Sequence, residues 1–144
     1  MKSALALLAT VVTLHAEDWV QFRGGNATGV SSSKGLPAEF SAEKNIAWKA
    51  PVGDGVGSAI IKDGVVYASG MAGDSKAAMH AFDAATGAAK WRTEFETGTL
   101  PRITPPNSHA AATPACDGER VYIHFSTIGL LAFDCATGKE AWRY

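Results

Sequence analysis

Residues 81–92, AFDAATGAAKWR, recur as residues 132–143, AFDCATGKEAWR, with eight of twelve positions identical and an offset of 51 residues. A shorter copy, Ala47-Trp48-Lys49, places its tryptophan 43 residues before Trp91. A fixed internal period indicates a repeat architecture, and about 40–50 residues is the period of one four-stranded propeller blade. The repeat therefore predicts an all-β fold, a partial β-propeller of about two four-stranded antiparallel blades.

Each unit of the repeat contains four short runs with strand character, separated by turn residues. The runs are residues 58–62, 65–69, 77–83 and 88–94 in the first unit and 112–116, 120–126, 129–134 and 139–144 in the second. Asp63-Gly64 and Asp117-Gly118 separate the first two runs of each unit, and such pairs favour tight hairpins because Gly adopts positive φ freely. We therefore expect a blade at residues 57–95, a polar inter-blade loop at 96–111, and a second blade, truncated at the C-terminus, at 112–144.

A second hairpin in each unit begins with an aspartate and ends with a glycine, Asp83 to Gly87 and Asp134 to Gly138. The Asp carboxylate can accept hydrogen bonds from backbone N–H groups of the turn, and the Gly takes the left-handed position. Because both copies carry these residues in register, we interpret the two carboxylates as turn clamps and not as catalytic groups.

Trp48, Trp91 and Trp142 each lie on the last strand of a unit and are followed by Lys or Arg. A ring that projects onto the next sheet would supply inter-blade area, worth roughly 4–6 kcal/mol at most when fully buried. The indole N–H would need a backbone acceptor on that neighbour. Stacking on nucleic acid is disfavoured, because it requires a basic groove and the formal net charge of the chain is −1.

The N-terminus has the pattern of a signal peptide at residues 1–16. Lys2 precedes the apolar run from Ala4 to Leu14, and Ala16 provides a small residue at the cleavage position. A run of about ten residues is too short to cross a ~30 Å hydrocarbon core. We therefore expect a periplasmic or secreted protein with no membrane span after cleavage, with an uncleaved anchor as the alternative.

Cys116 and Cys135 are the only cysteines of the chain. Export would permit a disulfide between them. The alternative is two thiols that pack as small hydrophobic groups. The second is favoured, because Cys116 falls at the end of a first strand and Cys135 in the hairpin between a third and a fourth.

The pattern Ala-Phe-Asp-x-x-Thr-Gly-x-x-x-Trp resembles the tryptophan-docking repeat of quinoprotein propellers, which is named after pyrroloquinoline quinone (PQQ). Residues 18–24, 35–37, 45–49 and 107–110 are similar to the opening of exported PQQ-like propeller proteins. The resemblance implies that the chain is the N-terminal part of a longer protein whose remaining blades are its partners. It also implies that residues 45–52, within the N-terminal segment 17–56, form a strand that closes the ring.

The resemblance leaves the activity open between two classes. The first is an exported scaffold for binding or assembly, with a protein or a small molecule as its ligand. The alternative is a PQQ-dependent dehydrogenase that oxidises an alcohol or a sugar. Such enzymes place adjacent cysteines against the quinone and bind calcium through acidic and amide groups, whereas Cys116 and Cys135 are 19 residues apart. We expect no cofactor in this part of the protein, with PQQ possible in the full-length protein. A third class, a β-sandwich binding module, would explain the strands but not the repeat.

The loop at residues 96–111 is the best candidate for a ligand site, because propellers carry their ligands on loops that enter the first strand of a blade. It is long and polar, whereas the corresponding residues 53–58 are short and Gly-rich. The candidate ligand-binding residues are Arg102, which would suit an anion, and Asn107, Ser108 and His109. The alternative is that these side chains only satisfy backbone groups at the start of a strand.

No other part of the sequence carries a catalytic or metal-binding signature. A serine nucleophile elbow, a phosphate-binding glycine loop and Cys/His metal spacing are all missing. His80 and His124 fall on expected strands, and we interpret them as packing residues. We therefore assign no catalytic residue and no metal ligand from the sequence.

Overall fold

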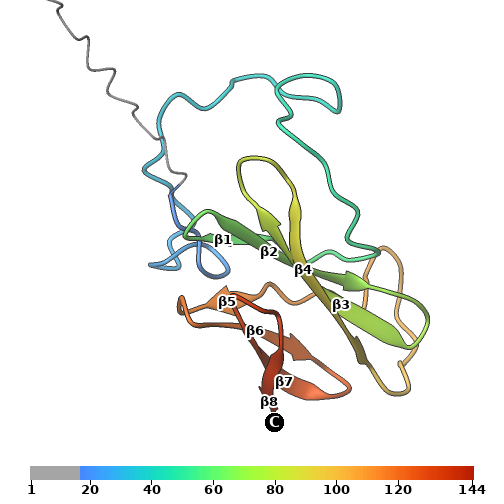
Figure 1. Ribbon diagram of the computed structural model, residues 1–144. Helices are drawn as coiled ribbons and strands as arrows, with labels where there is room; N and C mark the ends of the chain where they lie inside the picture. The colour runs from blue at the N-terminus through green and yellow to red at the C-terminus, as the bar shows by residue number, and fades with distance from the viewer. Residues whose placement is uncertain (1–16) are drawn as a thin grey trace, which may run out of the picture.

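The computed structural model describes residues 17–144, which contain two four-stranded sheets and no helix (Figure 1). The predicted signal peptide, residues 1–16, lies outside the described residues. The strands are β1 Ile60–Lys62, β2 Val65–Met71, β3 Lys76–Asp83, β4 Ala89–Glu96, β5 Ala115–Cys116, β6 Arg120–Phe125, β7 Gly129–Asp134 and β8 Glu140–Arg143. Each sheet is an antiparallel meander in chain order, β1-β2-β3-β4 and β5-β6-β7-β8. The predicted all-β fold with two four-stranded antiparallel blades is confirmed.

Turn residues determine the hairpins of both sheets. Asp63 and Gly64 both have positive φ, 49° and 73°, which a tight primed turn requires. The carboxylate of Asp83 accepts bonds from the backbone N–H and the hydroxyl of Thr86 at 2.9 and 2.8 Å. Asp134 makes the same pair of bonds with Thr137, at 2.8 and 2.7 Å. These hydrogen bonds, led by the threonine hydroxyl, lower the pKa of both aspartates.

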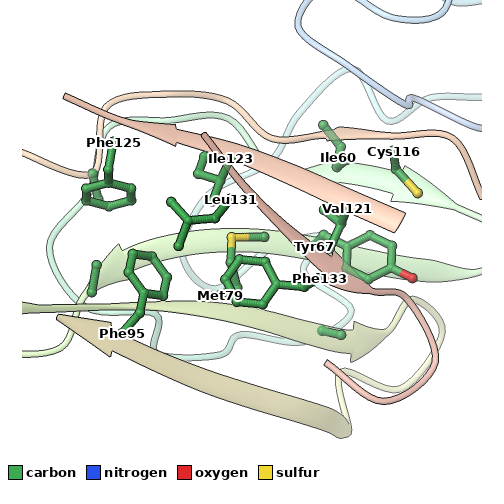
Figure 2. Packing of buried hydrophobic residues seen from close by; sticks show 13 residues of the cluster. Ile60, Tyr67, Met79, Phe95, Cys116, Val121, Ile123, Phe125, Leu131 and Phe133 are labelled. Carbon is green, nitrogen blue, oxygen red and sulfur yellow. The ribbon is translucent and has the colours of Figure 1, made fainter. Parts of the chain in front are cut away.

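The two sheets stack face to face and enclose one hydrophobic core (Figure 2). All four strands β1 to β4 contribute to one wall of this core, and β5, β6 and β7 contribute the other. Phe95 of β4 packs edge-on against Phe125 of β6, with ring centroids 5.2 Å apart, and its ring lies 5.7 Å from that of Phe133. Phe133 and Met79 are completely buried. Alternate residues of β6 face this core, whereas β3 is buried at consecutive positions, and the apolar residues of both sheets together produce the interface between the blades.

The N-terminal segment contains no strand, but it joins the two sheets. Trp19 and Ile61 of β1 exchange two backbone hydrogen bonds, of 2.8 and 3.0 Å. The next residue, Val20, accepts a bond of 2.8 Å from the N–H of Cys116 in β5. This segment therefore satisfies edge groups of the first strand in both blades. Such a contact was not predicted.

Residues 45–52 run without a ladder partner in the described part of the chain, so their role in closing a ring stays a prediction. Among residues 17–144 there is no helix of the length and apolar character needed to cross a membrane.

Candidate functional site

A hollow of about 490 Å³ lies where the chain enters the first strands of the two blades. Asp54 comes from the residues before β1, and His109 comes from the loop before β5. The β2–β3 turn contributes Asp74. The full lining consists of Asp54, Met71, Gly73, Asp74, Leu100 and His109. Three connections that are distant in the sequence thus line one site. We call this site the hollow.

Close backbone packing holds Asp54 in place at the rim of the hollow. The N–H of Met71, at the end of β2, donates to the carbonyl oxygen of Asp54 at 2.7 Å. Gly53 has φ of 87°, and a Cβ added there would lie 1.9 Å from the carbonyl oxygen of Met71. A Cβ on Gly70 would lie 1.8 Å from the carbonyl oxygen of Val52. Only glycine allows two backbones to approach this closely, so Gly53 and Gly70 determine where Asp54 sits.

His109 is positioned by a link between the two loops that enter β1 and β5. The N–H groups of Val56 and Gly57 donate to the carbonyl oxygen of Ala110, at 3.1 and 3.2 Å. Ser108 is buried, and its hydroxyl oxygen accepts a bond of 3.2 Å from the N–H of Ala110. The half-buried His109 lies between these two anchored residues. The loop before β5 is therefore held in place at the residues directly before and after His109.

The four predicted ligand-binding residues occupy different environments. His109 lines the hollow, whereas Ser108 turns inward and supports its own loop. Arg102 and Asn107 are exposed and do not line the hollow. Whether any of the four binds a ligand stays a prediction.

The two carboxylates of the hollow were not among the predicted residues. Asp54 lies in the short Gly-rich stretch 53–58, and Asp74 lies between two expected strands with no repeat signal. The glycines of this stretch were the one available sign, because glycine is typical of places where two backbones approach closely.

The charge of the lining determines which ligands suit the hollow. Asp54 and Asp74 supply two carboxylates, and none of the described lining residues is Lys or Arg. Such a surface favours a cationic or hydroxyl-bearing group over the anion for which Arg102 was considered. Within residues 17–144, His, Cys, Asp and Glu nowhere gather in threes so as to hold a metal ion.

The last strand of one unit docks on the hairpin of the next through a tryptophan. Trp91 of β4 donates from Nε1 to the carbonyl oxygen of Cys135, in the β7–β8 turn, at 2.8 Å. Its ring lies over Gly138, where a Cβ would come within 2.5 Å of ring atoms. Thr93 of the same strand donates its hydroxyl to the carbonyl oxygen of Gly138 at 2.6 Å. Gly138 is thus required both for its φ of 70° and for space under the ring.

Trp48 repeats this arrangement one unit earlier. Its Nε1 donates to the carbonyl oxygen of Ala84 at 2.9 Å, and a Cβ on Gly87 would lie 2.6 Å from its ring. Trp142 packs beside Tyr122 of its own sheet, with centroids 5.9 Å apart, and is 39% exposed. Two tryptophans therefore dock on an Asp-x-x-Thr-Gly turn of the following unit, while the third presents its ring to solvent.

A family model described as outer membrane protein assembly factor BamB, of the PQQ-type repeat, matches residues 17–144. The chain belongs to this family. A search of curated proteins found no significant match. Membership in the PQQ-like repeat family agrees with the resemblance stated from the sequence and with the tryptophan docking described above.

The hollow of this PQQ-like protein does not suit PQQ itself. The quinone carries several carboxylates, which require cationic or N–H partners. The described lining offers two aspartates, with the imidazole of His109 as its one side-chain N–H donor, and the residues of the hollow therefore do not fit this cofactor.

The two histidines on strands differ from each other. His80 of β3 is buried, 5% exposed, and stacks on Phe82 with centroids 5.7 Å apart. Burial lowers the pKa of its imidazole, so the neutral form is favoured. The interpretation of His80 as a packing residue is confirmed. The same interpretation is wrong for His124, whose side chain is exposed on β6, because alternate residues of this strand face solvent.

Proposed function

We propose that the protein is an exported PQQ-like propeller that serves as a scaffold for binding or assembly, with the hollow as its ligand site. The observation that carries this proposal is the convergence of Asp54, Asp74 and His109 from three separate connections. Loops held by a rigid sheet framework are the usual place for binding residues. The backbone anchors beside Asp54 and His109 hold these two residues in place before any ligand arrives.

The ligand is a group that combines positive charge or hydroxyl donors with a short apolar portion. Asp54 and Asp74 accept from such donors, while Met71 and Leu100 contact the apolar part. A volume of about 490 Å³ lies within the usual range for small-ligand sites. A basic side chain of a partner protein and a small organic amine both present this chemistry.

Export and further blades complete the proposal. Lys2 and the apolar run after it support a signal peptide, and hence a periplasmic or secreted location. The exposed ring of Trp142 supports docking on a further unit of the propeller, because Trp48 and Trp91 both dock on the following one. Expression with and without residues 1–16, followed by cell fractionation, tests export. Equal retention of both forms inside the cell would contradict it.

Calorimetric titration of the full-length protein tests the ligand site. The probes are a lysine-containing peptide, a small diamine and a sugar alcohol. We expect saturable binding of at least one probe, with Asp54→Asn/Asp74→Asn and His109→Ala each weakening it about tenfold or more, which is about 1.4 kcal/mol. Glu119→Gln is the matched control, since it removes an exposed carboxylate outside the hollow. Absence of binding by every probe, or equal loss in the control, would refute the proposal.

A further inference from the structure

The two cysteines of the chain lie side by side, although 19 residues separate them. Their Sγ atoms are 3.5 Å apart. The backbone explains this proximity, because the turn after β7 bends back over the β5–β6 turn and the N–H of Cys135 donates to the carbonyl oxygen of Glu119 at 3.0 Å. Both are free thiols in the structure, as expected from the sequence, but their proximity was not predicted.

Strand register places both side chains on the same face of the second sheet. Cys116 pairs with Val121, and Val121 pairs with Phe133. Cys135 follows Phe133 by two residues, so it faces the same side. All four contribute to the core between the blades or pack against it. Cys116 and Tyr67 lie near one another at one end of that core (Figure 2).

We propose that Cys116 and Cys135 form a redox pair that closes to a disulfide beneath the turn on which Trp91 docks. A bond requires the sulfur atoms to approach from 3.5 Å to about 2 Å. Rotation of the two side chains supplies this movement. The inference is independent of the ligand proposed for the hollow. It rests on the proposed export only for the oxidising compartment that the pair meets in the cell.

The oxidant is a disulfide, either a small molecule such as oxidised glutathione or a protein. The Cys135 thiolate attacks one sulfur of the oxidant, giving a mixed disulfide and releasing the first thiol. The Cys116 thiolate then attacks Sγ of Cys135 and releases the second thiol. The pair loses two electrons and two protons, and the oxidant becomes two thiols.

The environments of the two thiols determine the order of these steps. Cys135 is half-buried and is reached from solvent, whereas Cys116 is 7% exposed. Burial raises the pKa of the Cys116 thiol to about 12, so its thiolate is scarce and the second step is the slower one. The N–H of Gly118 lies 3.3 Å from Sγ of Cys116 and donates to it, which stabilises that thiolate as it forms.

Closure of the bridge would strengthen the contact between the blades. The carbonyl oxygen of Cys135 accepts from Nε1 of Trp91 at 2.8 Å and from the hydroxyl of Tyr67 at 3.5 Å. A covalent link from this residue to β5 would hold the acceptor under both donors. We expect the disulfide to raise the midpoint of thermal unfolding by about 10 °C, given the length of the loop that it closes.

Oxidation of the full-length protein with oxidised glutathione tests the proposal. Free thiols are then trapped with a maleimide, and intact mass and a non-reducing peptide map are recorded. We expect loss of two hydrogen masses, no glutathione adduct, and a cross-linked peptide pair containing Cys116 and Cys135. The thermal midpoint should rise and return to its first value after reduction with dithiothreitol.

Cys116→Ser is the matched control. It should leave Cys135 as a stable glutathione adduct without any rise in the thermal midpoint. Two results for the unsubstituted protein would overturn the proposal, namely two maleimide-labelled thiols after oxidation or separate glutathione adducts on both cysteines. The peptide map of the unsubstituted protein decides the question even if the variant fails to fold.

Discussion

Replacing Gly138 by alanine tests whether the tryptophan dock stabilises the contact between blades. The new Cβ would lie 2.5 Å from ring atoms of Trp91, so the ring must move away from the turn. We expect three losses: about 1–2 kcal/mol for alanine at a φ of 70°, about 0.5–1.5 kcal/mol for the indole hydrogen bond, and part of the ring contact. The total is about 2–4 kcal/mol of unfolding free energy.

Gly64→Ala is the matched control for the backbone part of this loss. Gly64 has φ of 73°, and a Cβ added there meets no heavy atom within 4 Å. Both substitutions also restrict the unfolded chain equally, so this contribution cancels in the comparison. The difference between the two variants therefore isolates the dock, and we expect about 1–2 kcal/mol.

Equilibrium unfolding in urea, followed by circular dichroism and tryptophan fluorescence, measures both variants in the full-length protein. The fluorescence of Trp91 should also report a more exposed ring in Gly138→Ala, and the Gly64→Ala spectrum should match that of the unsubstituted protein. Equal destabilisation by the two substitutions would refute the reasoning, because it would mean that the ring contributes nothing beyond the backbone strain.

The remaining predictions concern acid stability, the supporting loop and the quinone. Three hydrogen bonds, led by the hydroxyl of Tyr122, lower the pKa of Asp117 to about 2. Because the folded pKa lies below the ordinary 3.8, the carboxylate stabilises the fold above about pH 4, and this contribution is lost as pH falls toward 2. In Asp117→Asn the unfolding free energy should therefore fall less steeply between about pH 4 and pH 2 than in the unsubstituted protein. An unchanged dependence on pH would contradict this prediction. Ser108→Ala removes a buried acceptor and should cost about 1–3 kcal/mol in urea unfolding, whereas a cost close to zero would show that its bond to the N–H of Ala110 is dispensable. PQQ added to residues 17–144 should give no saturable binding below about 10 μM, which corresponds to roughly −7 kcal/mol; a saturable calorimetric titration in that range would disprove this.

The strands and turns of this protein follow from its sequence because they depend on short-range chemistry. Asp63-Gly64 predicted the first hairpin, and the observed φ values of 49° and 73° are those of the primed turn such a pair favours. The repeated Asp-x-x-Thr-Gly run predicted the second type of hairpin, whose carboxylate bonds occur in both copies.

The hollow was predicted only in part. The long polar loop drew attention to His109, because its position before a first strand is visible in the repeat. Asp54 and Asp74 have no shared pattern in the sequence, since their proximity depends on close packing of one backbone on the end of β2. Arg102 and Asn107 were selected as polar residues of the same loop, but both are exposed and lie outside the lining of the hollow.

The sequence by itself determined the all-β repeat, the strands and turns of each unit, and the family. A repeated pattern of turn residues and apolar positions specifies local geometry without reference to distant residues. Only the tertiary structure decided which connections meet. It joined Val20 to Cys116, brought Asp54 beside His109, and placed the sulfur of Cys135 against that of Cys116. The physical reason is that sheet twist and the bending of hairpins accumulate over many residues, and small rotations at each strand determine contacts between ends that the chain separates widely.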